Sequence, residues 1–123
     1  MVDYRLHSHN DTLSAQQIGE QVLQQTQVVR YPSYVRWLNT FVHLFTDEYY
    51  AAGYYSYVWA QVLAAHLFAR FKREGLLSSQ VGGDFERLIL ASGGTRPIAE
   101  LVESFAGSKP GIDALLLDLG IKT

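Results

Sequence analysis

Three tyrosines near the middle of the sequence have a spacing that would place their hydroxyls together. Tyr50, Tyr54 and Tyr57 stand at i, i+4 and i+7, so a continuous helix would carry all three on one face. Gly53 lies on the same side and leaves room for a backbone or a ligand to approach. His43 lies just upstream, across a junction short enough to fold back over this face. Converging neutral O–H and N–H donors could stabilise a developing oxyanion without being ionised.

The same tyrosines also have an ordinary structural explanation. Tyrosine rings commonly pack in a core and send their hydroxyls to its polar edge. Spacing alone favours this explanation, because packed rings are far commoner than arrays of donors. The residues by themselves therefore leave both interpretations open.

A second group of polar residues lies near the N-terminus, in the run LHSHND. An extended chain would turn His7 and His9 to the same side, and Asp11 follows them. Imidazole and carboxylate groups are zinc ligands. Ordinary surface or capping roles are the favoured explanation, because N-terminal segments are often mobile and no third ligand stands out. We also expect His66, in an apolar stretch, to be a hydrogen-bonded buried or interface histidine and not a catalyst.

Several enzyme motifs are missing from the sequence. It contains no His-Glu-x-x-His pair to hold zinc beside a glutamate base, no Gly-x-Ser-x-Gly elbow and no phosphate-binding Gly-Lys-Ser/Thr loop. The absence of cysteine excludes disulfides and Cys-based zinc or redox sites. The formal net charge of −2 gives no general basis for binding nucleic acid or an anionic membrane. We therefore expect no metal site and no cofactor in this chain alone.

Helical periodicity dominates the 123 residues, of which 48% are hydrophobic, and the length indicates a single domain over residues 1–123. Ser14 and Gln17 have the spacing of a capping box. Only VDYRLH offers a short strand-like alternation. The fold class predicted is all-α, with about six helices. They cover residues 15–29, 37–45, 50–74 before Gly75, 81–89, 98–105 after Thr95 as a cap, and 112–119 between Pro110 and Gly120.

The predicted helix over residues 50–74 is apolar nearly all round. We expect it to be central, with the shorter amphipathic helices wrapped around it or a second chain covering it. Residues 49–69 carry no formal charge, but their tyrosines, Gln61 and His66 would be costly to place in lipid, so we expect burial inside protein. The polar start of the sequence is unlike a secretory signal, which makes the cytoplasm the default location.

Longer stretches of the sequence resemble the thimet oligopeptidase and oligopeptidase A family of zinc metallopeptidases. The run AAGYYSYVWAQVLAAHLFARFKREG, residues 51–75, is similar to a hallmark of that family. VDYRLH, YPSYVRWLNTFVHLF and the closing DFERLILASGGTRPIAELVESFAGSKPGIDALLLDLGI resemble the segments on either side of it. The resemblance covers essentially the whole chain and is to the C-terminal segment of such an enzyme.

The resemblance implies a mostly helical enzyme that cuts short peptides, with zinc held by a His-Glu-x-x-His helix and a further glutamate upstream of the matching segment. It further implies catalytic donor roles for His43, Tyr50 and Tyr57, and substrate binding at Tyr54. Gly53, which leaves room for a ligand beside these tyrosines, is a further candidate for substrate binding. The family has a Gly-Gly pair before the first of these tyrosines. Here the places of that pair are taken by Glu48 and Tyr49. The junction from His43 is also about one residue longer than in the family, and His66 stands where the family has an acidic residue.

Two hypotheses follow. In the first, the chain is the substrate-binding part of a zinc oligopeptidase and is inactive alone. A partner chain with the zinc motif then restores activity, or a groove lined by tyrosines only binds short peptides. In the second, the chain is a non-enzymatic helical module that self-associates into a homodimer or a higher oligomer, because its apolar helix lacks upstream helices to cover it.

Overall fold

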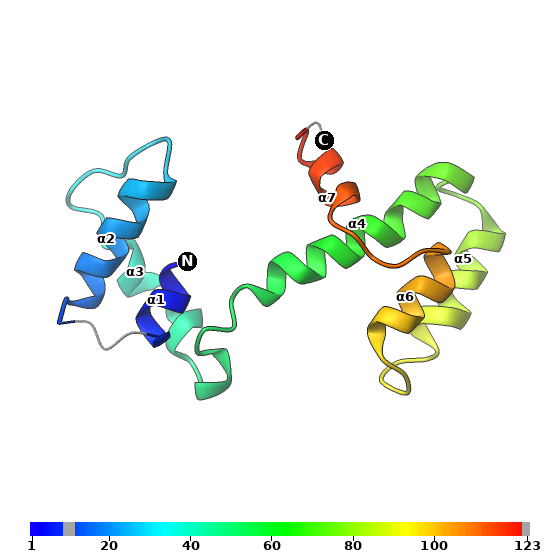
Figure 1. Cartoon of the computed structure of the whole chain (residues 1–123), viewed down its shortest axis with the longest axis horizontal. Helices are drawn as coiled ribbons and strands as arrows, with labels where there is room; N and C mark the ends of the chain where they lie inside the picture. The colour runs from blue at the N-terminus through cyan, green and yellow to red at the C-terminus, as the bar shows by residue number, and fades with distance from the viewer. Residues whose placement is uncertain (9–11, 122–123) are drawn as a thin grey trace. The chain divides into compact units, whose positions relative to one another are not determined.

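Two compact units make up the chain, residues 1–56 and residues 57–123. The structure is a computed structural model that describes residues 1–8 and 12–121. Every regular element within these two ranges is helical (Figure 1), which confirms the all-α class. In the ranges described there are seven α-helices, close to the six predicted, and three short segments of tighter or wider helix.

The first unit begins with three α-helices and ends in two 3-10 turns. The helices are α1 (Val2–Ser8), α2 (Ala15–Thr26) and α3 (Trp37–Thr40), and the turns are η1 (Val42–Phe45) and η2 (Glu48–Tyr50). Ile18 and Val22 on α2 are buried, as are Leu38 on α3 and Leu44 on η1. These four side chains are among the buried apolar residues of the first unit.

The start of α2 is as predicted, and its end is not. The Gln17 N–H donates to Ser14 Oγ at 3.3 Å, and the Ser14 N–H donates to Gln17 Oε1 at 2.8 Å, which confirms the capping box. The helix ends at Thr26 and does not continue to residue 29. Val28 and Val29 are exposed. β-Branched residues have low helix propensity and no core faces this pair, so nothing extends the helix.

The strand-like run VDYRLH is helical and forms α1, so the strand interpretation is wrong. Asp3 and His7 are four residues apart, the spacing at which helical side chains meet, and the His7 ring nitrogen Nδ1 lies 2.9 Å from the Asp3 carboxylate. The alternation of apolar and polar residues extends over only six residues, whereas the Asp3–His7 contact favours a helix.

The second unit contains α4 (Ser56–Glu74) from its second residue onward, α5 (Ser79–Phe85), a π-helical turn η3 (Glu86–Leu90), α6 (Ile98–Ala106) and α7 (Asp113–Asp118). Val81 of α5 and Leu101, Val102 and Phe105 of α6 are buried. The rings of Phe71, Phe85 and Phe105 pack on one another with centroids 5.5–5.7 Å apart. Leu115 of α7 packs on Val62 and Ala65 of α4.

Two features of α4 differ from the prediction. The helix begins at Ser56 and not near Tyr50, because residues 47–55 form successive turns. Of its side chains, only Val62 and Ala65 are buried, so a central helix wrapped by the others is not confirmed. Among the described residues, no helix is both long and apolar enough to cross a bilayer.

Two helices of the second unit end shortly before a glycine. Gly75 has φ +111° and closes α4, and Gly120 has φ +73° just after α7, as predicted from their positions. Thr95 does not cap α6, because Pro97 stands at that position with no side-chain cap. The Thr95 hydroxyl instead donates to the Ser92 carbonyl at 2.7 Å.

Candidate functional site

His43 is held in place by the short turn η1. Its neighbour Leu44 is almost completely buried, with 2% of its surface exposed, and anchors the turn in the core of the first unit. The Thr46 hydroxyl donates to the Val42 carbonyl at 3.0 Å and closes the turn on its other side. His43 is therefore carried by a fixed piece of backbone, with its own side chain half-buried.

Successive turns after η1 bring two tyrosines back to His43. The Asp47 carboxylate accepts a hydrogen bond from the Tyr49 N–H at 3.0 Å, which starts η2. The Gly53 N–H then donates to the Tyr50 carbonyl at 2.9 Å, and the Ser56 N–H donates to the Gly53 carbonyl at 3.0 Å. Each bond closes a tight turn, so the chain reverses within a few residues.

The result is a cluster of four rings, Phe41, His43, Tyr50 and Tyr54, called here the aromatic cluster. The His43 ring meets Tyr50 edge to face at a centroid distance of 4.7 Å and Tyr54 at 5.7 Å. The Phe41 ring contacts the Tyr54 ring edge to face at a centroid distance of 5.1 Å. Such edge-to-face pairs contribute about 0.5–1.5 kcal/mol each beyond their buried area. His43 therefore packs against the rings of both Tyr50 and Tyr54.

The tyrosines of the aromatic cluster remain accessible to a ligand. Tyr50 is 43% exposed and Tyr54 is 41% exposed. Each hydroxyl can donate one hydrogen bond, and the neutral imidazole of His43 can donate another. The aromatic cluster therefore contains the neutral donor groups expected from the sequence, and their action on a carbonyl oxygen stays a prediction.

Gly53 lies where its neighbours leave little room for a side chain. A Cβ at this position would come within 3.3 Å of the Tyr50 carbonyl oxygen and 3.4 Å of that of Tyr49. The close approach of backbone expected at Gly53 is thus present. A contact between Gly53 and a substrate stays a prediction.

Tyr57 does not share a helical face with Tyr50 and Tyr54. The helix that would have carried all three begins only at Ser56, so Tyr57 stands in the first turn of α4 and belongs to the second unit. The i, i+4, i+7 prediction is wrong for this reason. Tyr50 and Tyr54 meet through turns, which the helical spacing did not indicate.

Asp3 is a residue of the site that the sequence interpretation missed. Its carboxylate accepts hydrogen bonds from the backbone N–H of Ala52 at 3.1 Å and of Tyr54 at 2.8 Å. It is buried, with 6% of its surface exposed. These bonds join positions about fifty residues apart in sequence, and no local pattern points to them.

With this geometry in view, comparison with known proteins identifies the family. The family model described as Peptidase family M3 matches residues 1–121. The chain belongs to this family. Oligopeptidase A of Salmonella typhimurium is 39% identical over 125 aligned positions, covering 99% of this chain and 18% of that protein. The probable cytosolic oligopeptidase A of Arabidopsis thaliana is 35% identical, covering 98% of this chain and 18% of that protein. Dipeptidyl carboxypeptidase of Salmonella typhimurium is 31% identical, covering 98% of this chain and 18% of that protein. The chain thus spans about a fifth of the length of these relatives.

The described residues of this M3 chain do not fit a zinc ion. No three His, Asp or Glu side chains among them lie close enough to hold a metal. His7 Nδ1 lies 2.9 Å from both the backbone oxygen and the carboxylate of Asp3, which are acceptors only, so Nδ1 carries the proton and donates to them. His9 and Asp11 lie outside the described residues.

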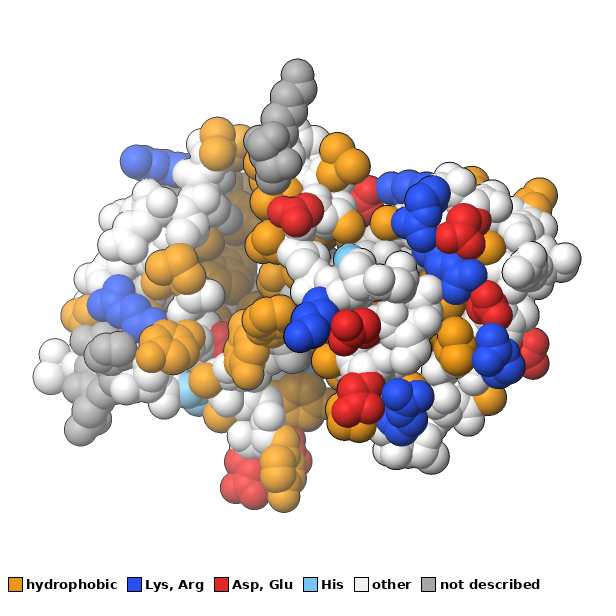
Figure 2. Space-filling view, turned by 45° about the vertical axis from the view of Figure 1, so that its right-hand side comes forward, with side chains coloured by type: hydrophobic (Ala, Val, Ile, Leu, Met, Phe, Trp, Pro, Cys, Tyr) orange, Lys and Arg blue, Asp and Glu red, His pale blue; other side chains and the backbone are white. Residues whose placement is uncertain are grey.

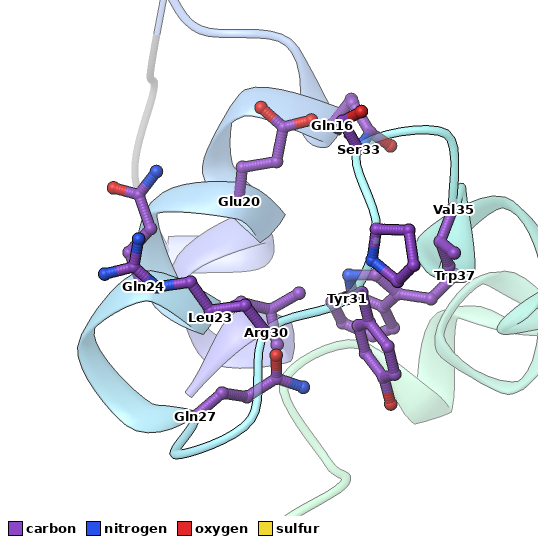
Figure 3. Close-up of a pocket in the computed structure, with 11 residues that line it drawn as sticks. Gln16, Glu20, Leu23, Gln24, Gln27, Arg30, Tyr31, Ser33, Val35 and Trp37 are labelled. Carbon is purple, nitrogen blue, oxygen red and sulfur yellow. Dashed lines mark hydrogen bonds between the residues drawn. The ribbon is translucent and has the colours of Figure 1, made fainter.

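A separate pocket of about 280 Å³ lies in the first unit, between α2 and the segment that follows it (Figure 3). Glu20 and Gln24 line it from α2, and Arg30, Tyr31 and Trp37 line it from that segment. No residue of the aromatic cluster lines this pocket, so it is distinct from the candidate site of the M3 chain.

Several charged residues of the second unit form ion pairs around Arg70. This guanidinium contacts Asp84 at 2.8 Å and Glu74 at 3.0 Å, and Figure 2 shows basic and acidic side chains next to one another on the surface. Hydrogen bonds from Arg70, and secondarily from Arg87, lower the pKa of Asp84. Those from Arg70, and secondarily from Arg73, lower the pKa of Glu74.

His66 also lies in the second unit, and its Nε2 lies 3.2 Å from the Ser108 carbonyl oxygen, to which it donates. The hydrogen bond predicted for His66 is present, but the side chain is only partly buried. These groups hold helices together, and we assign them no part in the chemistry of the site.

Proposed function

We propose that the aromatic cluster is the substrate-binding and oxyanion-stabilising part of an M3 oligopeptidase. His43 and the hydroxyls of Tyr50 and Tyr54 bind the carbonyl oxygens of a short peptide. Donors of this kind bind the negative charge of a tetrahedral intermediate more strongly than the neutral carbonyl it comes from, which is what lowers the barrier.

The observation that carries this proposal is the meeting of His43 with Tyr50 and Tyr54. Their rings lie 4.7 and 5.7 Å from the histidine ring, and both tyrosines are about two-fifths exposed. A cluster built only to fill a core would bury these rings more completely. Family membership supports the same assignment, because the relatives it matches are named oligopeptidases.

Catalysis requires a second component under this proposal. Hydrolysis needs an activated water as well as donors for the oxyanion, and in this zinc-dependent family the metal supplies that activation. The 123 residues contain no His-Glu-x-x-His pair. The chain alone therefore binds peptides without cleaving them, and another polypeptide segment carries the zinc motif.

The cytoplasm is the location that accompanies this proposal. The Arabidopsis relative named a probable cytosolic oligopeptidase A supports it.

Peptide binding to the chain alone tests the proposal. We expect acetyl-tetraalanine amide to bind the wild-type protein in a calorimetric or NMR titration. The double variant Tyr50→Phe, Tyr54→Phe keeps both rings and removes both hydroxyls, so its affinity should fall about tenfold, the loss of up to two neutral hydrogen bonds. Tyr34→Phe is the matched control, because Tyr34 is an exposed tyrosine of the first unit outside the cluster. Equal affinity in the double variant and the control would contradict the proposal.

Self-association is a second candidate, and exposed apolar side chains favour it. Val58 and Trp59, in the first turns of α4, are 55% and 61% exposed. A helix with so few buried side chains gains stability when a second surface covers it. A homodimer would do this without any peptidase activity. Light scattering at micromolar concentration should then give twice the mass of one chain, and Trp59→Gln should restore the single-chain mass. A single-chain mass for the wild type would count against this candidate.

A further inference from the structure

Asp3 stands out because it is a buried charge with no place in the proposed chemistry. Burying a carboxylate is costly unless hydrogen-bond donors compensate for the lost water. Three donors do so, namely the N–H groups of Ala52 and Tyr54 and the Nδ1–H of His7. Each of the two carboxylate oxygens accepts one backbone N–H, so the same turn binds both oxygens of Asp3.

The turn that Asp3 binds has an unfavourable backbone conformation. Ala52 has φ +56°, the left-handed region that residues with a Cβ rarely adopt. Such a conformation persists only where surrounding contacts hold it. The two bonds to Asp3 lie at Ala52 itself and two residues later, at Tyr54. They therefore fix both sides of the strained peptide.

We infer that Asp3 is the positioning residue of the aromatic cluster. By holding the Ala52–Tyr54 turn, it sets the direction in which the Tyr54 side chain leaves the backbone, and so the placement of its ring against His43. Asp3 contacts no substrate. The consequence for peptide binding rests on the proposed function, whereas the structural role of Asp3 does not.

His7 completes this support from within α1. Its Nδ1–H donates to Asp3, and its ring lies 6.1 Å from the ring of Phe45, the last residue of η1. The Asp3–His7 pair thus connects α1 with both segments that carry the aromatic cluster, the turn η1 with His43 and the turn with Tyr54.

The substitution Asp3→Asn tests the inference with almost no change of volume. Asparagine offers one acceptor oxygen and sets an NH2 donor against the other backbone N–H. In the 123-residue protein we expect the Ala52 and Tyr54 amides to exchange hydrogen at least about tenfold faster, as for loss of hydrogen bonds to a charged group. The ring-proton NMR signals of His43 should also move, because its contact with Tyr54 loosens.

Asp47→Asn is the matched control. The Asp47 carboxylate also accepts a backbone N–H in this segment, but only one, at Tyr49, and asparagine can still accept it. This variant should leave the exchange of Ala52 and Tyr54 and the His43 signals unchanged. The comparison separates the loss of a second acceptor from the loss of a negative charge.

Three outcomes decide the matter. Faster exchange confined to the turn, with moved His43 signals and unchanged α2 amides, supports the inference. Unchanged exchange at Ala52 and Tyr54 overturns it. Loss of protection throughout α2 overturns it too, because Asp3 would then support the whole unit and not the turn. Peptide titration of the same variant addresses the proposed function separately. If the turn loosens and affinity does not change, Asp3 positions the cluster and the proposed function fails.

Discussion

Tyr54 takes part both in the ring contacts of the aromatic cluster and in the backbone hydrogen bonds to Asp3. Its ring meets His43 and Phe41, and its backbone N–H is bound by Asp3. A residue held from both its ring and its backbone can present its hydroxyl in a fixed place, which is what electrostatic stabilisation of an oxyanion requires. At the scale of single residues, the account therefore depends on the geometry of the turn more than on the types of the residues in it.

Gly53 provides a prediction at this scale. In Gly53→Ala the new Cβ would press on the carbonyl oxygens of Tyr50 and Tyr49, at 3.3 and 3.4 Å, and backbone atoms move less easily than side chains. We expect the first unit to lose about 1 kcal/mol of stability and the His43 ring signals to shift. Hydrogen exchange of amides in residues 1–56 measures the first effect.

Gly82→Ala is the control for Gly53→Ala. Gly82 lies inside α5 with nothing within 4 Å of the new Cβ. Alanine should therefore stabilise the second unit by about 0.5–1 kcal/mol, since glycine is unfavourable in a helix interior. If Gly53→Ala does not lower the stability of the first unit, while Gly82→Ala behaves as expected, the turn at Gly53 is not tightly packed.

At the scale of elements, the sequence predicts well what depends on neighbours along the chain. The capping box at Ser14 and the glycine ends of α4 and α7 are local features, and the structure contains them. The amphipathic helix α6 follows from its apolar spacing in the same way. Boundaries that depend on turns were not predictable, and the start of α4 at Ser56 is the clearest case.

The ion pairs of Arg70 predict how the second unit responds to acid. Hydrogen bonds from arginine lower the pKa of Asp84 and Glu74 in the folded protein. A lowered folded pKa means that the stabilisation is complete above the ordinary values of 3.8 and 4.5, and is lost as the pH falls through the lower folded values. Thermal unfolding followed from about pH 6 to about pH 3 should show this loss.

The variant Asp84→Asn should flatten that acid dependence, because one of the two carboxylates no longer titrates. Glu103→Gln, at an exposed acidic residue of α6, is the charge-matched control and should keep the wild-type dependence. Equal acid dependence in Asp84→Asn and the wild type would show that the Arg70 pairs do not contribute to stability.

At the scale of the whole molecule, the family could be predicted from the sequence. The hydrogen bonds that hold the candidate site in place could not. The run of residues 51–75 carries enough of the family's pattern to indicate an oligopeptidase segment, and the match over residues 1–121 confirms it. The bond between Asp3 and the Ala52–Tyr54 turn joins distant parts of the chain. Periodicity and motifs report neighbours in sequence, so they contain no sign of it.

The most direct test of the central claim is a peptidase assay with a quenched fluorescent peptide. The purified 123-residue chain is assayed alone with zinc, and again with a second chain that carries a His-Glu-x-x-His motif from the same family. The account predicts no cleavage by the chain alone. It also predicts that the mixture cleaves the peptide, that a chelator abolishes this cleavage, and that the Tyr50→Phe, Tyr54→Phe double variant slows it. Chelator-sensitive cleavage by the chain alone would contradict the account.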